Sequence, residues 1–313
     1  MIVTVTFNPS LDEWVRVPRF APGALNRAVS FARYVGGKGI NVSRVVRELG
    51  GRTIAVGFAG GADGHILTTG LDALGVPHWL VHVPGSTRNN FKILSDHPKS
   101  FTEVNCPGPR VTRDAAGRMH RALHRLVRPR RTRALVLSGS LPPGLPDGIY
   151  AALLRQFRRP GLLTVLDASG AALRAGLRES PWLIKPNRQE AEELVGARMR
   201  GRAAVAKAAK ALTRRGPSLV MISLGPEGAA LASAAHEDVL WATPPAVRVV
   251  SAVGAGDSTV AGFLMGWRRT RSLPGALRLA MACGTACVMT PGTELGHRRD
   301  IERLAPKVKI AAA

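Results

Sequence analysis

Short runs rich in β-branched residues alternate with segments of helical spacing from about residue 53 onward, and this alternation limits the possible folds more than any other feature. Strands that alternate with helices build βαβ units, which form a mainly parallel sheet with helices on both faces. Candidate strands are residues 53–58, 134–138, 162–167, 182–185, 219–224 and 246–250. The sequence therefore predicts an α/β fold with a doubly wound, mainly parallel sheet.

Two segments interrupt this alternation. Residues 13–35 alternate like two strands around a Pro-Gly turn, and residues 87–106 alternate like a hairpin around residues 96–99. We expect them to form a small antiparallel β lid. The rest of the chain, residues 1–12, 36–86 and 107–313, is then the α/β core. A small sheet exposed on one face is unstable by itself, so we expect a homodimer in which two lids pair.

The net charge of +23 comes from 44 lysines and arginines against 21 acids. The densest basic run, residues 120–133, is compatible with nucleic-acid binding or with a solvated helix face and loop. No aromatic residues interleave the run, so we favour the solvated surface and expect no nucleic-acid partner.

Other global features point to an intracellular protein. No stretch approaches the apolar length of a membrane span, and the first residues lack the pattern of a signal peptide. The three cysteines, an odd and low number, argue against a disulfide framework. Cys283 and Cys287 lie four apart on an apolar segment, and we expect them to pack in the core. The sequence predicts a cytoplasmic protein with no membrane partner.

Ligands of such sheets bind at the carboxyl ends of the strands, where two glycine-rich turns are expected. The first turn, residues 36–41 (GGKGIN), precedes a helical pattern. Its glycines allow close approach of a ligand to unpaired N–H groups, and Lys38 and Asn41 can add hydrogen bonds. A tight turn with a purely structural role is the alternative.

The second turn, residues 251–259 (SAVGAGDST), places Gly-Ala-Gly directly before Asp257 at the start of a helix. Asp257 has two possible uses: it caps the helix, or it accepts a proton from a hydroxyl while nearby amides hold the charge of a phosphoryl group. Capping alone does not require Gly254, Ala255 and Gly256. We therefore interpret this turn as an anion hole with a base beside it.

Three further segments carry weaker signals. Asn187 and Glu190 lie three apart at a helix start, which suits either a site for hydrated Mg²⁺ or a capping box. Residues 223–228 form a glycine turn that suits close approach of a nucleotide. Arg88 in the expected lid can pair with a phosphate, or can be an ordinary surface arginine.

Taken together and in this order, these segments resemble the ribokinase-like carbohydrate kinases, in the branch that acts on phosphosugars. The resemblance covers nearly the whole chain and is highly specific only as a combination. The matching segments are residues 8–12, 36–41, 87–88, 107–109, 138–142, 167–170, 185–190, 223–225 and 254–257.

The resemblance implies transfer of the ATP γ-phosphate to a sugar-phosphate hydroxyl. Asp257 would be the base, and the anion hole would be Gly254, Ala255 and Gly256. The sugar would be held by Asp12, Gly37, Lys38 and Asn41, and its phosphate by Arg88. ATP would contact Lys185, Asn187, Ser223, Leu224, Gly225, Pro226, Glu227 and Gly228. Mg²⁺ would be organised, through water, by Asn187 and Glu190. A monovalent cation such as K⁺ would lie near Ser251, Val253, Thr290 and Gly292.

The expected lid indicates the substrate. Residues 102–109 (TEVNCPGP) are most similar to the 1-phosphofructokinase group, which implies conversion of fructose 1-phosphate to fructose 1,6-bisphosphate. Ala168 stands where Thr or Ser is usual in the family, and Cys106 where Glu is common, so substrate choice stays open. The alternatives are tagatose-6-phosphate kinase and the minor type of 6-phosphofructokinase. A remoter alternative is a non-catalytic protein that senses phosphosugars or binds nucleic acid.

Overall fold

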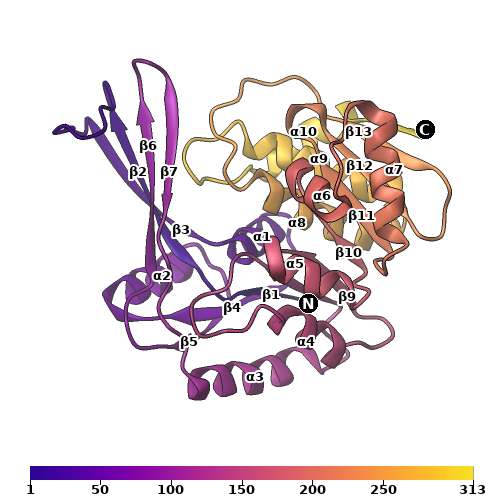
Figure 1. Cartoon of the computed structure of the whole chain (residues 1–313), viewed down its shortest axis with the longest axis horizontal. Coiled ribbons are helices and arrows are strands. Elements are labelled where there is room, and N and C mark those ends of the chain that lie inside the picture. The colour runs from indigo at the N-terminus through magenta and orange to yellow at the C-terminus, as the bar shows by residue number, and fades with distance from the viewer. Residues whose placement is uncertain (313) are drawn as a thin grey trace.

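The computed structural model describes residues 1–312, and the strands within this range form a ten-stranded sheet and a four-stranded sheet (Figure 1). Seven neighbouring strands of the large sheet are parallel, and three are added antiparallel at one edge. The order across the large sheet is β14 (Lys309–Ala312), β13 (Val239–Thr243), β12 (Ala229–Ser233), β11 (Leu219–Ser223), β10 (Leu183–Ile184), β9 (Leu163–Asp167), β8 (Ala134–Ser138), β1 (Ile2–Thr6), β4 (Thr53–Ala59), β5 (His78–His82).

Helices cover both faces of the large sheet. One face packs under α3 (Arg113–Val127), α4 (Ile149–Gln156), α5 (Gly170–Leu177), α6 (Arg188–Val195) and α7 (Gly201–Thr213). The other packs under α1 (Lys38–Glu48), α8 (Ala255–Thr270), α9 (Leu273–Cys287) and α10 (Arg298–Leu304). Short 3-10 helices are η1 (Gly225–Glu227) and η2 (Ala305–Lys307).

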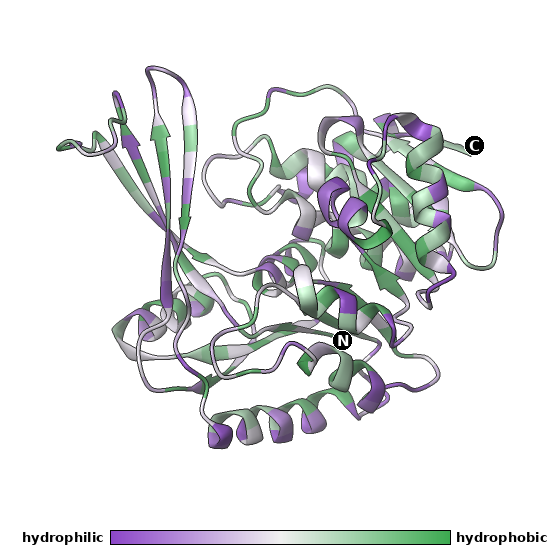
Figure 2. Ribbon diagram, viewed as in Figure 1, coloured by the Kyte–Doolittle hydropathy of each residue, from purple (hydrophilic) through white to green (hydrophobic). Residues whose placement is uncertain are grey.

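The strands of the large sheet are apolar on both faces. Along β8, Leu135 and Leu137 join one buried cluster, whereas Ala134 and Val136 join the other. Figure 2 accordingly shows hydrophobic residues concentrated on the large sheet and bands of hydrophilic residues along α3. Burial on both faces confirms the doubly wound α/β fold.

Five of the six predicted strands are present, with ends within one residue of the predicted ones. The strand predicted at residues 246–250 is wrong: this segment is irregular, and Val249 and Val250 are 62% and 51% exposed. Pro244 and Pro245 directly precede it and have no N–H to donate, and the amide of Val250 bonds to the carbonyl of Val288 rather than to a strand. The sequence patterns did not predict β1, β5, β12, β13 or β14, and β12 is rich in alanine, a poor strand former.

The small sheet has the order β3 (Ser30–Gly36), β2 (Ser10–Val17), β6 (Arg88–Ser95), β7 (Ser100–Asn105) and stands away from the large sheet (Figure 1). Both hairpins are antiparallel as predicted, but β2 and β6 pair in parallel, because they belong to separate insertions that both leave the core in the same direction. Helix α2 (Gly61–Ala73) packs beneath this sheet. Domain boundaries at the predicted residue numbers stay a prediction.

Within residues 1–312, no helix is both long enough and apolar enough to cross a membrane.

Candidate active site

The predicted motifs meet at the carboxyl edge of the large sheet. Asp167 ends β9, Lys185 directly follows β10 and Ser223 ends β11, while α1 and α8 both begin at this edge. Hydrogen bonds join these elements: Lys38 on α1 contacts Asp167, and Asn41 on α1 contacts Asp257 on α8. The two glycine turns, although far apart in sequence, therefore build one site.

Asp257 lies in the first turn of α8 and is 7% exposed. Asn41 Nδ2 donates to its Oδ2 at 2.9 Å. Burial raises the pKa of Asp257 from its usual 3.8 to about 6, against the opposing effect of the Lys38 charge. The helix cap is Gly254, with φ of 82° and no side-chain bond, so Asp257 does not serve as the cap. The carboxylate is available for chemistry.

The turn before Asp257 presents backbone donors. The amide of Ala255 donates to the carbonyl of Ala252 at a long 3.3 Å, whereas the amides of Gly254 and Gly256 have no hydrogen-bond acceptor within the described residues. A Cβ added to Gly256 would lie 3.3 Å from Lys185 Nζ, so the lysine ammonium borders the same turn. Free amides, a helix N-terminus and an ammonium together make an anion site.

Asp167 joins the same charged cluster, although the sequence motifs assigned it no role of its own. Its Oδ1 accepts from Lys38 Nζ at 3.1 Å and lies 3.3 Å from Lys185 Nζ, and the residue is 1% exposed. Burial acts to raise the pKa of Asp167, but the two ammonium groups outweigh it and hold the pKa below its usual range. Its signal in the sequence was an acid at the carboxyl end of a buried strand.

The expected sugar-binding acid, Asp12, is held by three side chains. Its Oδ1 accepts from Ser10 Oγ at 3.0 Å and from Asn90 Nδ2 at 3.4 Å, and its Oδ2 accepts from Thr293 Oγ1 at 3.2 Å. The contacts of Asn90 and Thr293 with Asp12 were not predicted, because both depend on how distant segments pack.

Gly37 and Arg88 border this region. Gly37 has φ of 130°, and a Cβ there would lie 2.8 Å from Thr6 Cγ2, so only glycine suits the turn. Arg88 donates to the carbonyls of Asn8 at 2.9 Å and Cys106 at 3.3 Å. Its buried Nε has no hydrogen-bond partner among the described residues, and burial lowers the pKa of the guanidinium. Arg88 thus retains an unused donor.

Asn187 and Glu190 form the capping box that was the structural alternative. Asn187 Oδ1 accepts from the Glu190 amide, and Glu190 Oε2 accepts from the Asn187 amide, both at 2.8 Å. Glu190 still acts electrostatically on Lys38, so its carboxylate faces the charged cluster. Within residues 1–312 no three His, Cys, Asp or Glu side chains gather as a direct metal cage.

The glycine turn after β11 lies next to this cap. Asn187 and Ser223 form a parallel bridge, and Arg188 Nη2 donates to Glu227 Oε1 at 2.7 Å. Leu224, Gly225, Pro226 and Gly228 complete the turn, of which Gly225–Glu227 is η1.

The expected monovalent-cation neighbourhood is also contiguous. Ser251 Oγ donates to the carbonyl of Gly292 at 2.7 Å and accepts from the Val253 amide at 3.3 Å. Thr290 Oγ1 lies 2.7 Å from the carbonyls of both Cys287 and Glu294. Several oxygens therefore gather beside the turn that holds Asp257.

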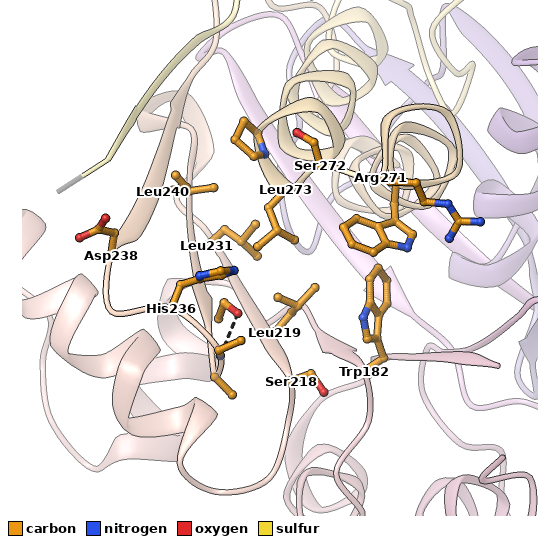
Figure 3. Close-up of a pocket in the computed structure, with 15 residues that line it drawn as sticks. Trp182, Ser218, Leu219, Leu231, His236, Asp238, Leu240, Arg271, Ser272 and Leu273 are labelled. Carbon is orange, nitrogen blue, oxygen red and sulfur yellow. Dashed lines mark hydrogen bonds between the residues drawn. The ribbon is translucent and has the colours of Figure 1, made fainter. Parts of the chain in front are cut away.

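A pocket of about 810 Å³ lies elsewhere, near the amino ends of β10 and β11 (Figure 3). Trp182 and Trp267 line it, with Arg271 at the end of α8, so it lies at the opposite end of that helix from Asp257. None of the predicted site residues lines it. Hydrogen bonds and buried charges, rather than pocket size, locate the candidate active site.

A doubly wound core, a β sheet at its site and an acid beside free amides at a helix start are features of a carbohydrate kinase. The model of the pfkB carbohydrate kinase family matches residues 5–298. The chain belongs to this family and is a phosphosugar kinase.

Three relatives illustrate the similarity. The chain is 34% identical over 310 residues to the 1-phosphofructokinase of Bacillus subtilis, with 99% of each sequence covered. It is also 34% identical over 301 residues to the tagatose-6-phosphate kinase of Staphylococcus epidermidis, with 95% of this chain and 94% of that one covered. Phosphofructokinase-2 from Escherichia coli, in complex with substrates and products, has a TM-score of 0.91 at 31% identity over 98% of both chains. The same enzyme in complex with potassium has a TM-score of 0.89 at 30% identity, again over 98% of both chains.

Proposed function

We propose that this chain transfers the γ-phosphate of ATP to fructose 1-phosphate and produces fructose 1,6-bisphosphate. The observation that carries the proposal is the buried Asp257. Its carboxyl group has a pKa of about 6, and it follows directly after the free amides of Gly254 and Gly256. A base with a pKa near neutrality can accept the proton of the attacking hydroxyl. The amides stabilise the negative charge on the transferred group.

The sugar lies, in this proposal, between Asp12 and Asp257. Asp12 and Asn41 bond its hydroxyls, with the Gly37 turn and Lys38 beside them. Arg88 binds the phosphate already on the sugar, and its unused buried Nε supports this role.

The nucleotide side is assigned to Lys185, Asn187 and residues 223–228. Mg²⁺, when bound, would neutralise phosphate charge, and Glu190 would hold it through water with the carboxylate oxygen that the capping box leaves free. K⁺ would bind the oxygens around Ser251, Val253, Thr290 and Gly292, and the potassium complex of the E. coli relative supports this proposal.

The choice of fructose 1-phosphate rests on the lid segment 102–109 and on the B. subtilis relative. Tagatose 6-phosphate and fructose 6-phosphate are the competing acceptors, because this chain is as similar to the tagatose-6-phosphate kinase of S. epidermidis (34% identity) as to the 1-phosphofructokinase of B. subtilis. ADP release with Mg-ATP decides between them when the three sugars are compared at matched concentrations. We expect the highest kcat/KM with fructose 1-phosphate; a preference for a 6-phosphate would keep the kinase and change the substrate. If none of the three sugars supports ADP release, the proposal is wrong.

We also propose a homodimer through the small sheet. Phe31, Phe91 and Val104 share one face of this sheet and are 40–58% exposed. Apolar side chains gathered on one thin sheet mark an association surface. Light scattering should show a dimer that Phe31→Asp converts to monomer. Leu74→Asp, at a 47% exposed leucine outside the small sheet, is the matched control and should remain dimeric.

A cytoplasmic location is proposed from the thiols. All three cysteines are free, and burial raises the pKa of Cys287 to about 11 and that of Cys283 further. Protonated, buried thiols serve packing rather than metal or redox chemistry, and they suit a reducing compartment.

A further inference from the structure

Two polar side chains connect the sugar end of the site to the base end and have no role in the function proposed above. Arg44 lies on α1, one helical turn after Asn41, and Thr293 lies in the loop after α9. Arg44 Nη1 donates to Asn41 Oδ1 at 3.3 Å and to the carbonyl of Thr293 at 3.0 Å. Burial lowers the pKa of the guanidinium, yet no carboxylate lies within 4.0 Å of it among the described residues. The largely buried Arg44 guanidinium therefore donates to two neutral oxygens, those of the Asn41 side chain and the Thr293 carbonyl.

Arg44 determines which end of the Asn41 amide faces the base. An asparagine amide has an acceptor oxygen and a donor nitrogen, whereas a guanidinium can only donate. Because Arg44 holds the oxygen, the Asn41 nitrogen faces Asp257 and donates at 2.9 Å. A reversed amide would place its oxygen against the carboxylate and repel it.

Thr293 is fixed in the same way at the sugar end. The indole of Trp14 can only donate, and it donates to Thr293 Oγ1 at 3.0 Å. The Thr293 hydroxyl proton therefore points to Asp12 Oδ2 at 3.2 Å. Trp14 and Asp12 both lie on β2 of the small sheet, and Thr293 is fully buried. The small sheet thus sets the direction of this bond.

We propose that Arg44 and Thr293 are positioning residues for phosphoryl transfer: Arg44 orients the Asn41 amide toward Asp257, and Thr293 orients the Asp12 carboxylate toward the sugar. They act as one unit, because the carbonyl of Thr293 anchors Arg44 while its hydroxyl anchors Asp12. The kinetic part of this inference rests on the proposed function.

The charges around Asp257 come from several elements. Lys38 on α1, Asp167 at the end of β9 and Lys185 after β10 act on it, and the Cys287 thiol on α9 lies nearby. Arg44 is not among the largest influences on the pKa of Asp257. Its effect on the base therefore passes through Asn41.

The test compares Arg44→Met, which removes all donors at similar volume, with Arg44→Lys, which keeps the charge and can reach one acceptor. We expect kcat to fall about 10- to 100-fold in Arg44→Met, with the KM for ATP unchanged, because the reacting groups are misplaced. The acid limb of the pH profile should move to higher pH, since the carboxylate of Asp257 loses its donor. Arg44→Lys should recover part of both effects.

Thr293 gives the opposite kinetic pattern. Thr293→Val removes the hydroxyl at nearly constant volume, and the KM for the sugar phosphate should rise about 10- to 100-fold, as for loss of a hydrogen bond to a charged group. kcat should change little, and Thr293→Ser should restore the KM. A Thr293→Val enzyme with wild-type KM would overturn the role of Thr293.

A double-mutant cycle separates positioning by Arg44 from general destabilisation. Once Asn41→Ala has removed the amide, Arg44→Met should cost little further activity. Fully additive losses would overturn the inference.

If the wild-type protein phosphorylates none of the three sugars, the proposed function fails. The inference is then tested by a titration that does not depend on enzymatic activity. The Asp257 carboxyl is titrated by ¹³C NMR, with Asp257→Asn identifying its signal; a higher pKa in Arg44→Met supports the inference, and an unchanged pKa overturns it.

Discussion

Asp257→Asn is expected to make the folded protein more stable at neutral and alkaline pH while it abolishes the base. Burial raises the pKa of Asp257 from 3.8 to about 6, and the residue is 7% exposed. A raised pKa means that the protonated form contributes stability, which is fully present below 3.8 and is lost as the pH rises through about 6. The difference corresponds to about 3 kcal/mol.

The asparagine variant avoids the free-energy cost of a buried carboxylate, because its side chain is neutral at every pH and its oxygen can still accept from Asn41. Its free energy of unfolding should exceed that of the wild type by up to about 3 kcal/mol at pH 8. The advantage should shrink as the pH falls through 6 and disappear near pH 4.

Asp167→Asn in the same cluster is the matched control with the opposite sign. The pKa of Asp167 lies below its usual range, so its charged form contributes stability that is lost only in acid. A neutral side chain leaves Lys185, which is 5% exposed, without its counter-ion, at a cost of about 3–5 kcal/mol. Lys38 is 37% exposed, so solvent offsets most of its share.

Thermal unfolding of the wild type and both variants at pH 8, 6 and 4.5 measures these effects. At pH 8 the midpoint should rise by several degrees for Asp257→Asn and fall for Asp167→Asn, at roughly 2–4 °C per kcal/mol. An Asp257→Asn midpoint equal to or below that of the wild type at pH 8, or a gain that does not shrink toward pH 4.5, would refute the reasoning from buried charge.

Three further predictions concern the same turn. Asp257→Asn should lower kcat by about 10²- to 10⁴-fold in the ADP-release assay, and unchanged turnover would remove Asp257 as the base. In the wild type, kcat/KM should fall with decreasing pH below about 6, where Asp257 becomes protonated; a profile flat to pH 4.5 would contradict this. Gly254→Ala should lower stability by about 1–3 kcal/mol in chemical denaturation, because its φ is 82° and a Cβ would lie 2.7 Å from Leu295 Cδ2. Gly148→Ala is the control, since its φ is −78° and a Cβ there meets nothing within 4 Å; an equal loss in both variants would argue against strain at Gly254.

The sequence by itself determined the local structure around the site. Sequence patterns indicated three kinds of local structure: the glycine turns before Lys38 and Ala255, the capping box of Asn187 and Glu190, and the hairpin turn at residues 96–99. Each depends on backbone preferences and hydrogen bonds within a few residues, which a single segment encodes. The run 246–250 shows the limit of such signals, because β-branched residues form a strand only where a partner strand is available.

Only the tertiary structure decided which charges and donors meet. Asp167 pairs with Lys38 across 129 positions of sequence, and Asp12 bonds Thr293 across 281. Two acids of one cluster, Asp167 and Asp257, have their pKa values moved in opposite directions, although each follows or precedes an ordinary glycine-containing turn. Burial and the distance to an ammonium group set these directions, and both quantities exist only once distant strands and helices have packed against one another.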